Sequence, residues 1–458
     1  MQRITRISSG RFLLGAIIAL GGLLLSVHAG SADQIPTGWQ ANNLRPVGYS
    51  RLDGNAASKL SIKRVDGRWY LYAAGRGLHI LDVTDAADPK YLKFIPAPQN
   101  TAVSQVTLHG NLLITNLSRP ITPDELSGKG DGFCKLQVEA LPDKTYQEGV
   151  LIWDISNPVE PKQLSHWEGH SAGTHRNSYL GGKYAFLSST VPGFRGFILL
   201  ILDITDPAHP NEAGRWWYPG TRQNEQPGEV CASFHGPAAV SPDGKMLSAG
   251  YTPAAINLDI SDIAHPKLIG KLTFIPPFNN AGTQAVHTVL PLWDRQMLYV
   301  SSEASRVDCN EPLNFAGLVD NSDPARPWLI SLFPVPVPPP DAPYKDFCEK
   351  GGRFGPHNVN TETHLPDVEQ PGNLIYLTYF NAGLRVYNIK NRRLPVEAGW
   401  FIPPNPDSPK LSQGGMLKVN QTQEVLVDTR GYIYITDSAW GIWVLRYSGP
   451  DQPAPTAH

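Results

Sequence analysis

Four histidines stand at equivalent places in four similar stretches of the chain. The stretches are "THRNSYLGGK", "HGPAAVSPDGK", "HTVLPLWDRQ" and "HNVNTETHLP", which contain His175, His235, His287 and His357. Each of these histidines precedes a run typical of a β-strand, so all four are expected at the head of a strand. Imidazole is largely neutral near neutral pH and binds transition metals well. If the strand heads converge, the pattern predicts a metal site, with Fe or Cu favoured.

Acidic and basic side chains also lie close to these histidines in the sequence. Glu229, Glu303 and Glu362 are expected to orient the imidazoles as outer hydrogen-bond partners, with exposed loop acids as the alternative. Arg176 and Arg353 could hold an anionic group of a substrate, or they could pair with these acids. The sequence does not indicate which residue would be catalytic.

For each histidine taken alone, a structural role is the alternative, because a histidine at the head of a strand often only bonds a backbone carbonyl group. His109 lies in a hairpin turn, and His209 and His265 lie in "AHP" segments between strands. These three do not share the common position, so they are excluded from the predicted site.

A repeat that runs through the chain indicates how the histidines are positioned. It is seen in "LHILDVTDAADPKYL", "VLIWDISNPVEPKQL", "LLILDITDPAHPNEA" and "AINLDISDIAHPKLI", with two degraded copies further on. In each copy an apolar strand ends at Asp or Asn, whose side chain can shape a turn, and a Pro follows seven residues later. The pairs are Asp82 and Pro89, Asp154 and Pro161, Asp203 and Pro210, Asp259 and Pro266, Asp320 and Pro327, and Asn388 and Pro395.

Each repeat, with the hairpin before it, predicts four antiparallel strands, and a seventh unit ends the chain without the connector. We therefore predict an all-β fold, a seven-bladed β-propeller of four-stranded antiparallel blades. The segment "WQANNLRPVGYSRL" is expected to add the strand that closes the ring. The four histidines would then lie near one end of the channel, with Ser61, Ser104 and Glu424 at the matching places of the other blades.

The segments "LHILDVTD", "LLILDITDPAHP" and "INLDISDIAHP" resemble LVIVD repeats, which occur in many exported bacterial propellers. This resemblance implies the fold but no single activity. "NLIYLTYFNAGLRVYNI" is more distantly similar to the selenium-binding-protein/methanethiol oxidase propellers. The predicted site also resembles in geometry that of carotenoid-cleavage oxygenases, propellers whose axial iron is held by four histidines.

The first 32 residues have the pattern of a secretory signal peptide, with cleavage expected after Ala29 or Ala32. Residues 33–450 are then expected to form a single propeller domain and residues 451–458 a disordered tail. The mature protein is expected to be periplasmic or secreted and to contain no transmembrane span.

Four cysteines follow the predicted signal peptide, and in an oxidising compartment they favour two disulfides. Four cysteines permit three connectivities. Cys309 with Cys348 is favoured because the two flank the Pro-rich stretch "FPVPVPPPDAP", which leaves Cys134 with Cys231.

Two hypotheses for function follow from the sequence. The first is a metal-dependent oxidoreductase or oxygenase that acts on a small or aromatic substrate. The alternative is a non-catalytic propeller that binds a protein or glycan at the cell surface. A net charge of −2, from 39 basic and 41 acidic residues, argues against a nucleic-acid partner. The sequence indicates neither the reaction nor the oligomeric state.

Overall fold

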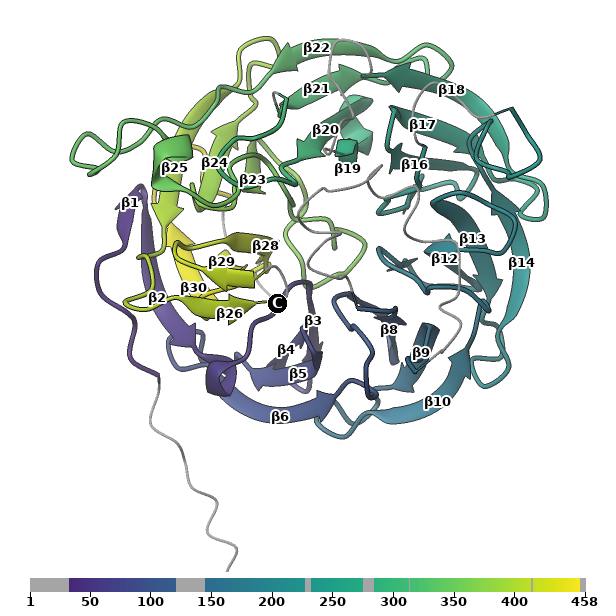
Figure 1. The fold of residues 1–458 in the computed structure, drawn as a ribbon, viewed down its shortest axis with the longest axis horizontal. Coiled ribbons are helices and arrows are strands. Elements are labelled where there is room, and N and C mark those ends of the chain that lie inside the picture. Colours follow the sequence, from purple (N-terminus) through teal and green to yellow (C-terminus); the bar gives the residue numbers. More distant parts are fainter. Residues whose placement is uncertain are drawn as a thin grey trace, which may run out of the picture. The chain divides into compact units, whose positions relative to one another are not determined.

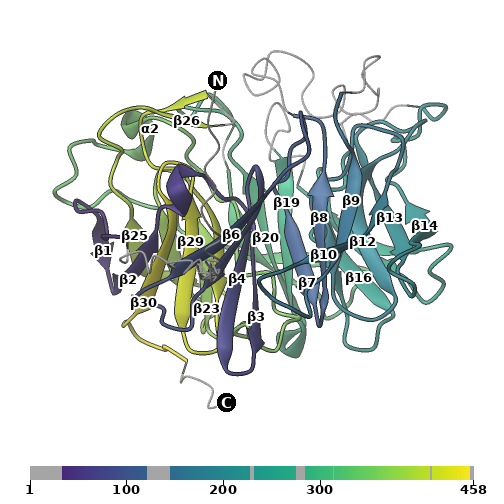
Figure 2. The ribbon, with the colours of Figure 1, turned by 90° about the horizontal axis from the view of Figure 1, so that it is seen from below.

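Seven antiparallel sheets of four strands each surround a central axis in the part of the chain that the structure describes (Figure 1). The structure is a computed structural model, and it describes residues 33–120, 145–226, 232–274, 284–312, 314–412 and 415–453. Seen from the side, the strands run roughly along the ring axis (Figure 2). The predicted all-β, seven-bladed propeller is therefore confirmed.

The blades follow one another in chain order, and the strands of each blade are named from the innermost outwards. Blades one to three are β3 (Leu60–Val65), β4 (Arg68–Ala74), β5 (Gly77–Asp82) and β6 (Lys90–Pro96); β7 (Val106–His109), β8 (Leu112–Leu117), β9 (Gly149–Asp154) and β10 (Lys162–Trp167); and β11 (Ser178–Tyr179), β12 (Tyr184–Thr190), β13 (Phe197–Asp203) and β14 (Asn211–Trp216). Blades four and five are β15 (Ala239–Val240), β16 (Met246–Tyr251), β17 (Ala254–Asp259) and β18 (Lys267–Thr273); and β19 (Gln284–Leu292), β20 (Met297–Glu303), β21 (Ala316–Asp320) and β22 (Trp328–Leu332).

The last two blades take strands from both ends of the described chain. Blade six is β23 (Leu374–Thr378), β24 (Leu384–Asn388), β25 (Val396–Ile402) and β1 (Gln40–Asn42), and blade seven is β28 (Thr422–Val427), β29 (Tyr432–Asp437), β30 (Gly441–Tyr447) and β2 (Leu44–Ser50). A short hairpin of β26 (Lys410–Ser412) and β27 (Gly415–Leu417) precedes blade seven. The predicted closing segment thus supplies two outermost strands instead of one.

The connector that follows each Asp or Asn of the repeat has the structure that its sequence predicts. It joins the third and fourth strands in blades one to five, and it joins β24 to β25 in blade six. In all six copies the side-chain Oδ1 of the Asp or Asn accepts a hydrogen bond from the backbone N–H two residues later, at 2.8 to 3.0 Å. This bond turns the chain at the end of the strand that the Asp or Asn closes. The next strand then begins in antiparallel register with the strand before the turn.

Glycines in the outermost strands allow neighbouring blades to approach closely. A Cβ atom built on Gly214 of β14 would lie 2.0 Å from the backbone oxygen of Ile263, in the connector of blade four. Backbone cannot move aside as a flexible side chain can. The lack of a side chain at Gly214 is therefore what lets the connector of blade four rest on blade three.

We expect Gly214→Ala to lower the free energy of unfolding by about 1 to 3 kcal/mol, because the added methyl group overpacks this contact between blades. Urea unfolding of the purified protein measures the change. Gly372→Ala is the matched control, since a Cβ atom there meets no atom within 4 Å. Equal stability of the two variants would contradict the close contact at Gly214.

A segment from Asn358 to Gln370, which we call the axial segment, lies inside the ring (Figure 1). It contacts blade two through His364, whose Nε2 lies 3.0 Å from Leu108 O, and blade one through Asp367, which accepts from the Arg64 N–H at 2.9 Å. Val368 forms a bridge with Asp428 next to blade seven. The axial segment therefore connects the inner edges of several blades across the channel.

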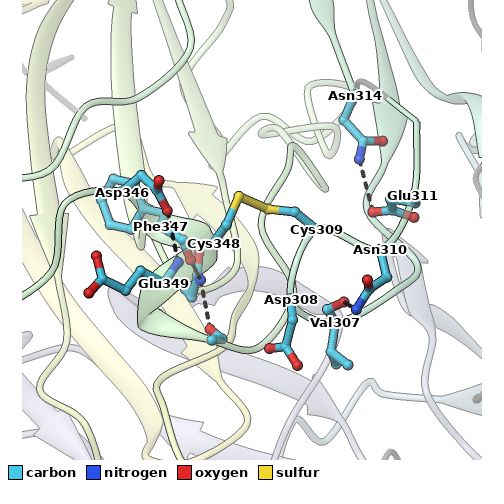
Figure 3. The surroundings of a disulfide bond; sticks show 12 residues. Val307, Asp308, Cys309, Asn310, Glu311, Asn314, Asp346, Phe347, Cys348 and Glu349 are labelled. Atoms are coloured by element: carbon cyan, nitrogen blue, oxygen red, sulfur yellow. Dashed lines mark hydrogen bonds between the residues drawn. A yellow bond between two sulfur atoms is a disulfide. The ribbon is translucent and has the colours of Figure 1, made fainter.

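A disulfide joins Cys309 to Cys348, as predicted, with the Cα atoms 5.5 Å apart (Figure 3). Cys348 lies in the single turn of helix α2 (Phe347–Lys350), which Asp346 caps by accepting from the Glu349 N–H at 2.8 Å. Cys134 and Cys231 lie outside the described residues, so their pairing stays a prediction. Among the described residues, no helix has the length and apolar character that crossing a membrane requires.

We expect the double substitution Cys309→Ser with Cys348→Ser to lower the free energy of unfolding by about 2 to 4 kcal/mol, because it frees a long loop in the unfolded chain. The two cysteines are 39 positions apart. Thermal unfolding followed by circular dichroism measures the loss. Unchanged stability of the double variant relative to the oxidised wild type would show that this bond does not constrain the fold.

Candidate metal centre

The four predicted histidines come from four consecutive blades. His175 and His235 precede the innermost strands β11 and β15, and His287 lies within β19. The backbone N–H groups of His175, His235 and His357 donate to carbonyl oxygens at the edge of their own blades, at 2.8, 3.0 and 2.9 Å. The sheets therefore fix the position from which each imidazole extends.

His357 differs from the prediction in its local structure. It was expected at the head of the innermost strand of blade six, but there the innermost position is reduced to one bridge, between Val359 and Leu377. The chain turns instead into the axial segment, whose residues bond other blades. Strand β1 brings blade six to four strands from the outer side.

The imidazole rings nevertheless lie side by side. Ring centroids of consecutive histidines are 5.1 Å apart for His175 and His235, 4.1 Å for His235 and His287, and 5.0 Å for His287 and His357. His235 and His287 are buried, whereas His175 and His357 are partly exposed. The structure brings the four side chains together, and their role as metal ligands stays a prediction.

Glu303, at the end of β20, lies on the same side of the imidazoles as their Nε2 atoms. Its carboxylate oxygens are 3.2 Å from Nε2 of His287 and 3.6 Å from Nε2 of His357. One donor atom from each of His235, His287 and Glu303 lies within 4.8 Å of the other two. The expected outer partner of the imidazoles is thus placed where a direct ligand would be.

Hydrogen bonds at Nδ1 fix the orientation and the tautomer of two imidazoles. His357 Nδ1 lies 2.7 Å from the backbone oxygen of Gln423, which can only accept, so this nitrogen carries hydrogen. The Thr288 hydroxyl donates to the backbone oxygen of His357 at 3.2 Å and so accepts from His287 Nδ1 at 2.7 Å. In both rings the lone pair is then on Nε2 and faces Glu303.

Burial keeps the four imidazoles neutral. It lowers the pKa of His175 to about 3, with a further lowering from the positive charge of Arg176. Burial is also the largest cause of the lowered pKa values of His235, His287 and His357. Burial raises the pKa of Glu303, although Arg353 and Arg176 oppose this effect. The two Nε2 atoms therefore face the Glu303 carboxyl group with two cations beside it. Arg353 donates to Glu303 at 3.1 Å, and Arg176 Nη1 lies 3.4 Å from His287 Nε2.

The two arginines both lie at the cluster, with different partners. Arg176 is buried and donates to the backbone oxygen of His287 at 3.1 Å and to Asn358 Oδ1 at 2.9 Å. Burial lowers its pKa to about 10, which leaves it charged at neutral pH. Arg353 donates to Glu303 at 3.1 Å and stacks 3.8 Å above the ring of Phe380. Arg353 was expected either to hold an anionic group of a substrate or to pair with an acid. The structure shows it paired with Glu303.

A second buried cluster lies across the axis, between blades one and seven and the axial segment. Lys59 Nζ is 3.2 Å from Glu362 and 3.5 Å from Glu424, and the Ser61 hydroxyl donates to Glu362 at 3.0 Å. Burial raises the pKa of Glu424 to about 7. Glu362 therefore pairs with Lys59 and Ser61 rather than with the imidazoles that it was expected to orient. Glu229 lies outside the described residues.

Sequence reasoning singled out neither Lys59 nor Thr288. Lys59 precedes a strand in "AASKLSIKRV", a context shared by many exposed lysines. Thr288 could have been found from its position directly after His287, since a hydroxyl group there can reach the Nδ1 atom of that histidine.

The excluded histidines lie apart from the cluster. His209 and His265 are exposed in the connectors, and each bonds the Asp three residues before it, at 2.9 and 3.1 Å. His109 stacks on His364 of the axial segment, with ring centroids 6.1 Å apart. His209 and His265 are therefore suitable controls for the histidines of the candidate site.

One comparison with known proteins identifies a repeat in the chain. The model of the LVIVD repeat matches residues 180–217, which run through most of blade three. This β-propeller carries an LVIVD repeat. The similarity of blade six to the selenium-binding-protein/methanethiol oxidase propellers stays a prediction.

No curated protein matches this LVIVD-repeat propeller. Among solved structures it is similar to Raptor from Chaetomium thermophilum, with a TM-score of 0.47 and 14% sequence identity. The match covers 91% of this chain and 30% of the Raptor chain. A similarity of this size does not bear on function.

Proposed function

We propose that the axial histidine cluster binds a transition-metal ion, Fe or Cu, and that the protein is a metal-dependent oxidoreductase. His235, His287 and Glu303 would hold the ion, and His357 and His175 would add further imidazole ligands. The observation that carries this proposal is the pair of Nε2 atoms, from His287 and His357, that face the Glu303 carboxyl group at 3.2 and 3.6 Å.

The donor set fits such an ion. Two imidazoles and one carboxylate are the ligands typical of non-haem Fe(II) oxygenases, and further imidazoles suit both Fe and Cu. The hydrogen bonds from Nδ1 of His287 and His357 hold the rings as outer partners of metal ligands do. A bound Fe or Cu ion would supply one-electron chemistry and a position for dioxygen.

The cluster meets solvent at one edge, which suits a small substrate. Phe380 stacks on His357, with ring centroids 4.6 Å apart, and the guanidinium group of Arg353 also lies over the Phe380 ring. His357, Glu303 and Arg353 are partly exposed, so a substrate would reach the cluster along this edge. The disulfide between Cys309 and Cys348 fits an exported protein, since such bonds persist in oxidising compartments.

The short distances between Glu303 and the imidazoles have a competing explanation. A protonated Glu303 carboxyl group can donate to an imidazole nitrogen. In that case the cluster would be structural and the propeller non-catalytic. The two explanations differ in metal content, which is measured directly.

The test is metal analysis by inductively coupled plasma mass spectrometry of protein purified without a nickel column. After anaerobic loading with Fe(II) or Cu(II) and removal of excess ion, about one equivalent per chain is expected. Less than about a tenth of an equivalent for every ion tried would overturn the proposal. Consumption of dioxygen by the loaded protein with panels of small aromatic compounds then tests the reaction class.

A further inference from the structure

Among the residues that the structure describes, the charged side chains buried around the axis balance one another without any metal. Three cations face three carboxylates, and they are Lys59, Arg176 and Arg353 against Glu303, Glu362 and Glu424. Arg176 interacts electrostatically with all three carboxylates, so the two clusters form one network. The neutral imidazoles add no charge to it.

Glu311 and Glu424 change the net charge of this buried network only slightly. Glu311 faces Arg353 from the rim, where it is partly exposed and accepts from the N–H groups of Ser305 and Arg306 at 3.0 and 3.1 Å. If it is counted, one negative charge remains in excess. Glu424 acts in the opposite sense, because its raised pKa of about 7 leaves it only partly ionised near neutral pH.

A dication bound among the imidazoles would therefore leave at least one positive charge uncompensated in a largely buried site. Burying an unpaired charge is costly, so a loaded site of this kind favours a negatively charged ligand. We propose that the substrate of the axial site binds as a small anion, such as a carboxylate, phenolate or thiolate. This inference rests on the proposed metal site and specifies its substrate class.

The exposed edge of the cluster has a group suited to such a ligand. Arg353 is 24% exposed, and its carboxylate partner Glu303 is also a proposed metal ligand. A cation that draws on Glu303 weakens its bond to Arg353. The guanidinium group is then available to an anion that enters beside His357, and its planar donors match carboxylate geometry.

Azide and Cu(II) are the probes for the test. The affinity of the protein for Cu(II) is measured by competition with a chelator, with and without saturating azide. Azide is expected to tighten Cu(II) binding at least about fivefold, and the azide-to-Cu(II) charge-transfer band reports that both occupy one site. Metal-free protein is expected to bind no azide.

Variants in the second cluster change the charge without touching the proposed ligands. Lys59→Met is expected to tighten Cu(II) binding in the absence of azide and to reduce the gain from azide. Glu362→Gln is expected to weaken Cu(II) binding in the absence of azide and to increase the gain from azide. The double variant, with the net charge restored, is expected to match the wild type, and circular dichroism melting confirms that each variant is folded.

The outcomes separate this inference from the proposed function. If the wild type binds no Cu(II) or Fe(II), the metal site itself is wrong. If it binds Cu(II) but azide leaves the affinity unchanged, the anion inference alone is overturned. The same conclusion follows if Lys59→Met and Glu362→Gln shift the Cu(II) affinity in the same direction. Should Lys59→Met not fold, Glu362→Gln and the double variant still decide the sign.

Discussion

His287→Ala is expected to lower the affinity for Fe(II) or Cu(II) by more than about a hundredfold, because loss of an outer partner alone typically costs about 10- to 100-fold. His287 is at the centre of the row of rings, 4.1 and 5.0 Å from its two neighbours, and its Nε2 faces Glu303. Chelator competition and metal analysis measure the loss.

The fold should survive this change, since each blade packs through its own strands and the apolar core lies between blades. His265→Ala is the matched control, because His265 is exposed in a connector and bonds only its own turn. Thr288→Val should give an intermediate loss of about 10- to 100-fold, since it removes the hydroxyl group that holds His287 Nδ1. Wild-type metal affinity in all three variants would mean that the cluster binds no metal.

Removal of residues 33–50 is expected to prevent cooperative folding. This segment contains both β1 and β2, which cover the outer edges of β25 and β30. Tyr49 packs on Trp443 with ring centroids 5.1 Å apart, and its hydroxyl group donates to Trp440 O. A Cβ on Gly48 would meet the Ala86 oxygen at 2.1 Å, so β2 also rests on the connector of blade one.

Far-ultraviolet circular dichroism and thermal unfolding of the truncated protein provide the measurement, with no sharp transition expected. A chain that begins at Trp39 keeps both strands and is the control, expected to unfold like the protein that begins at residue 33. A cooperative transition at the control temperature in the shorter chain would show that the ring does not depend on this closure.

The fold could be predicted because its signal is local and repeated. Each Asp or Asn of the repeat bonds the N–H two residues on, and this short-range turn leaves the same residues at the same spacing in every copy. The histidines could be placed for the same reason, since alignment of the repeats puts them in one column. Their convergence follows from ring symmetry and needs no knowledge of side-chain contacts.

The partners of the histidines could not be predicted in this way. Glu303 reaches the cluster from the end of a second strand, and Lys59 meets Glu362 only because the axial segment crosses the channel. The reduced inner strand of blade six has the same cause, because residues after Val359 bond other blades. Such contacts join residues distant in sequence, so no local sequence pattern predicts them.

The two N-terminal strands also determine the order in which the molecule can fold. Gln40 pairs with Ile402 and Leu44 with Tyr447, so almost the whole described chain must be present before either strand finds its partner. Contacts of such long sequence separation form late and slowly. Until then β25 and β30 have unpaired outer edges, which are prone to pair with other chains. A slow final step and a tendency to aggregate before it are therefore properties of this ring closure itself.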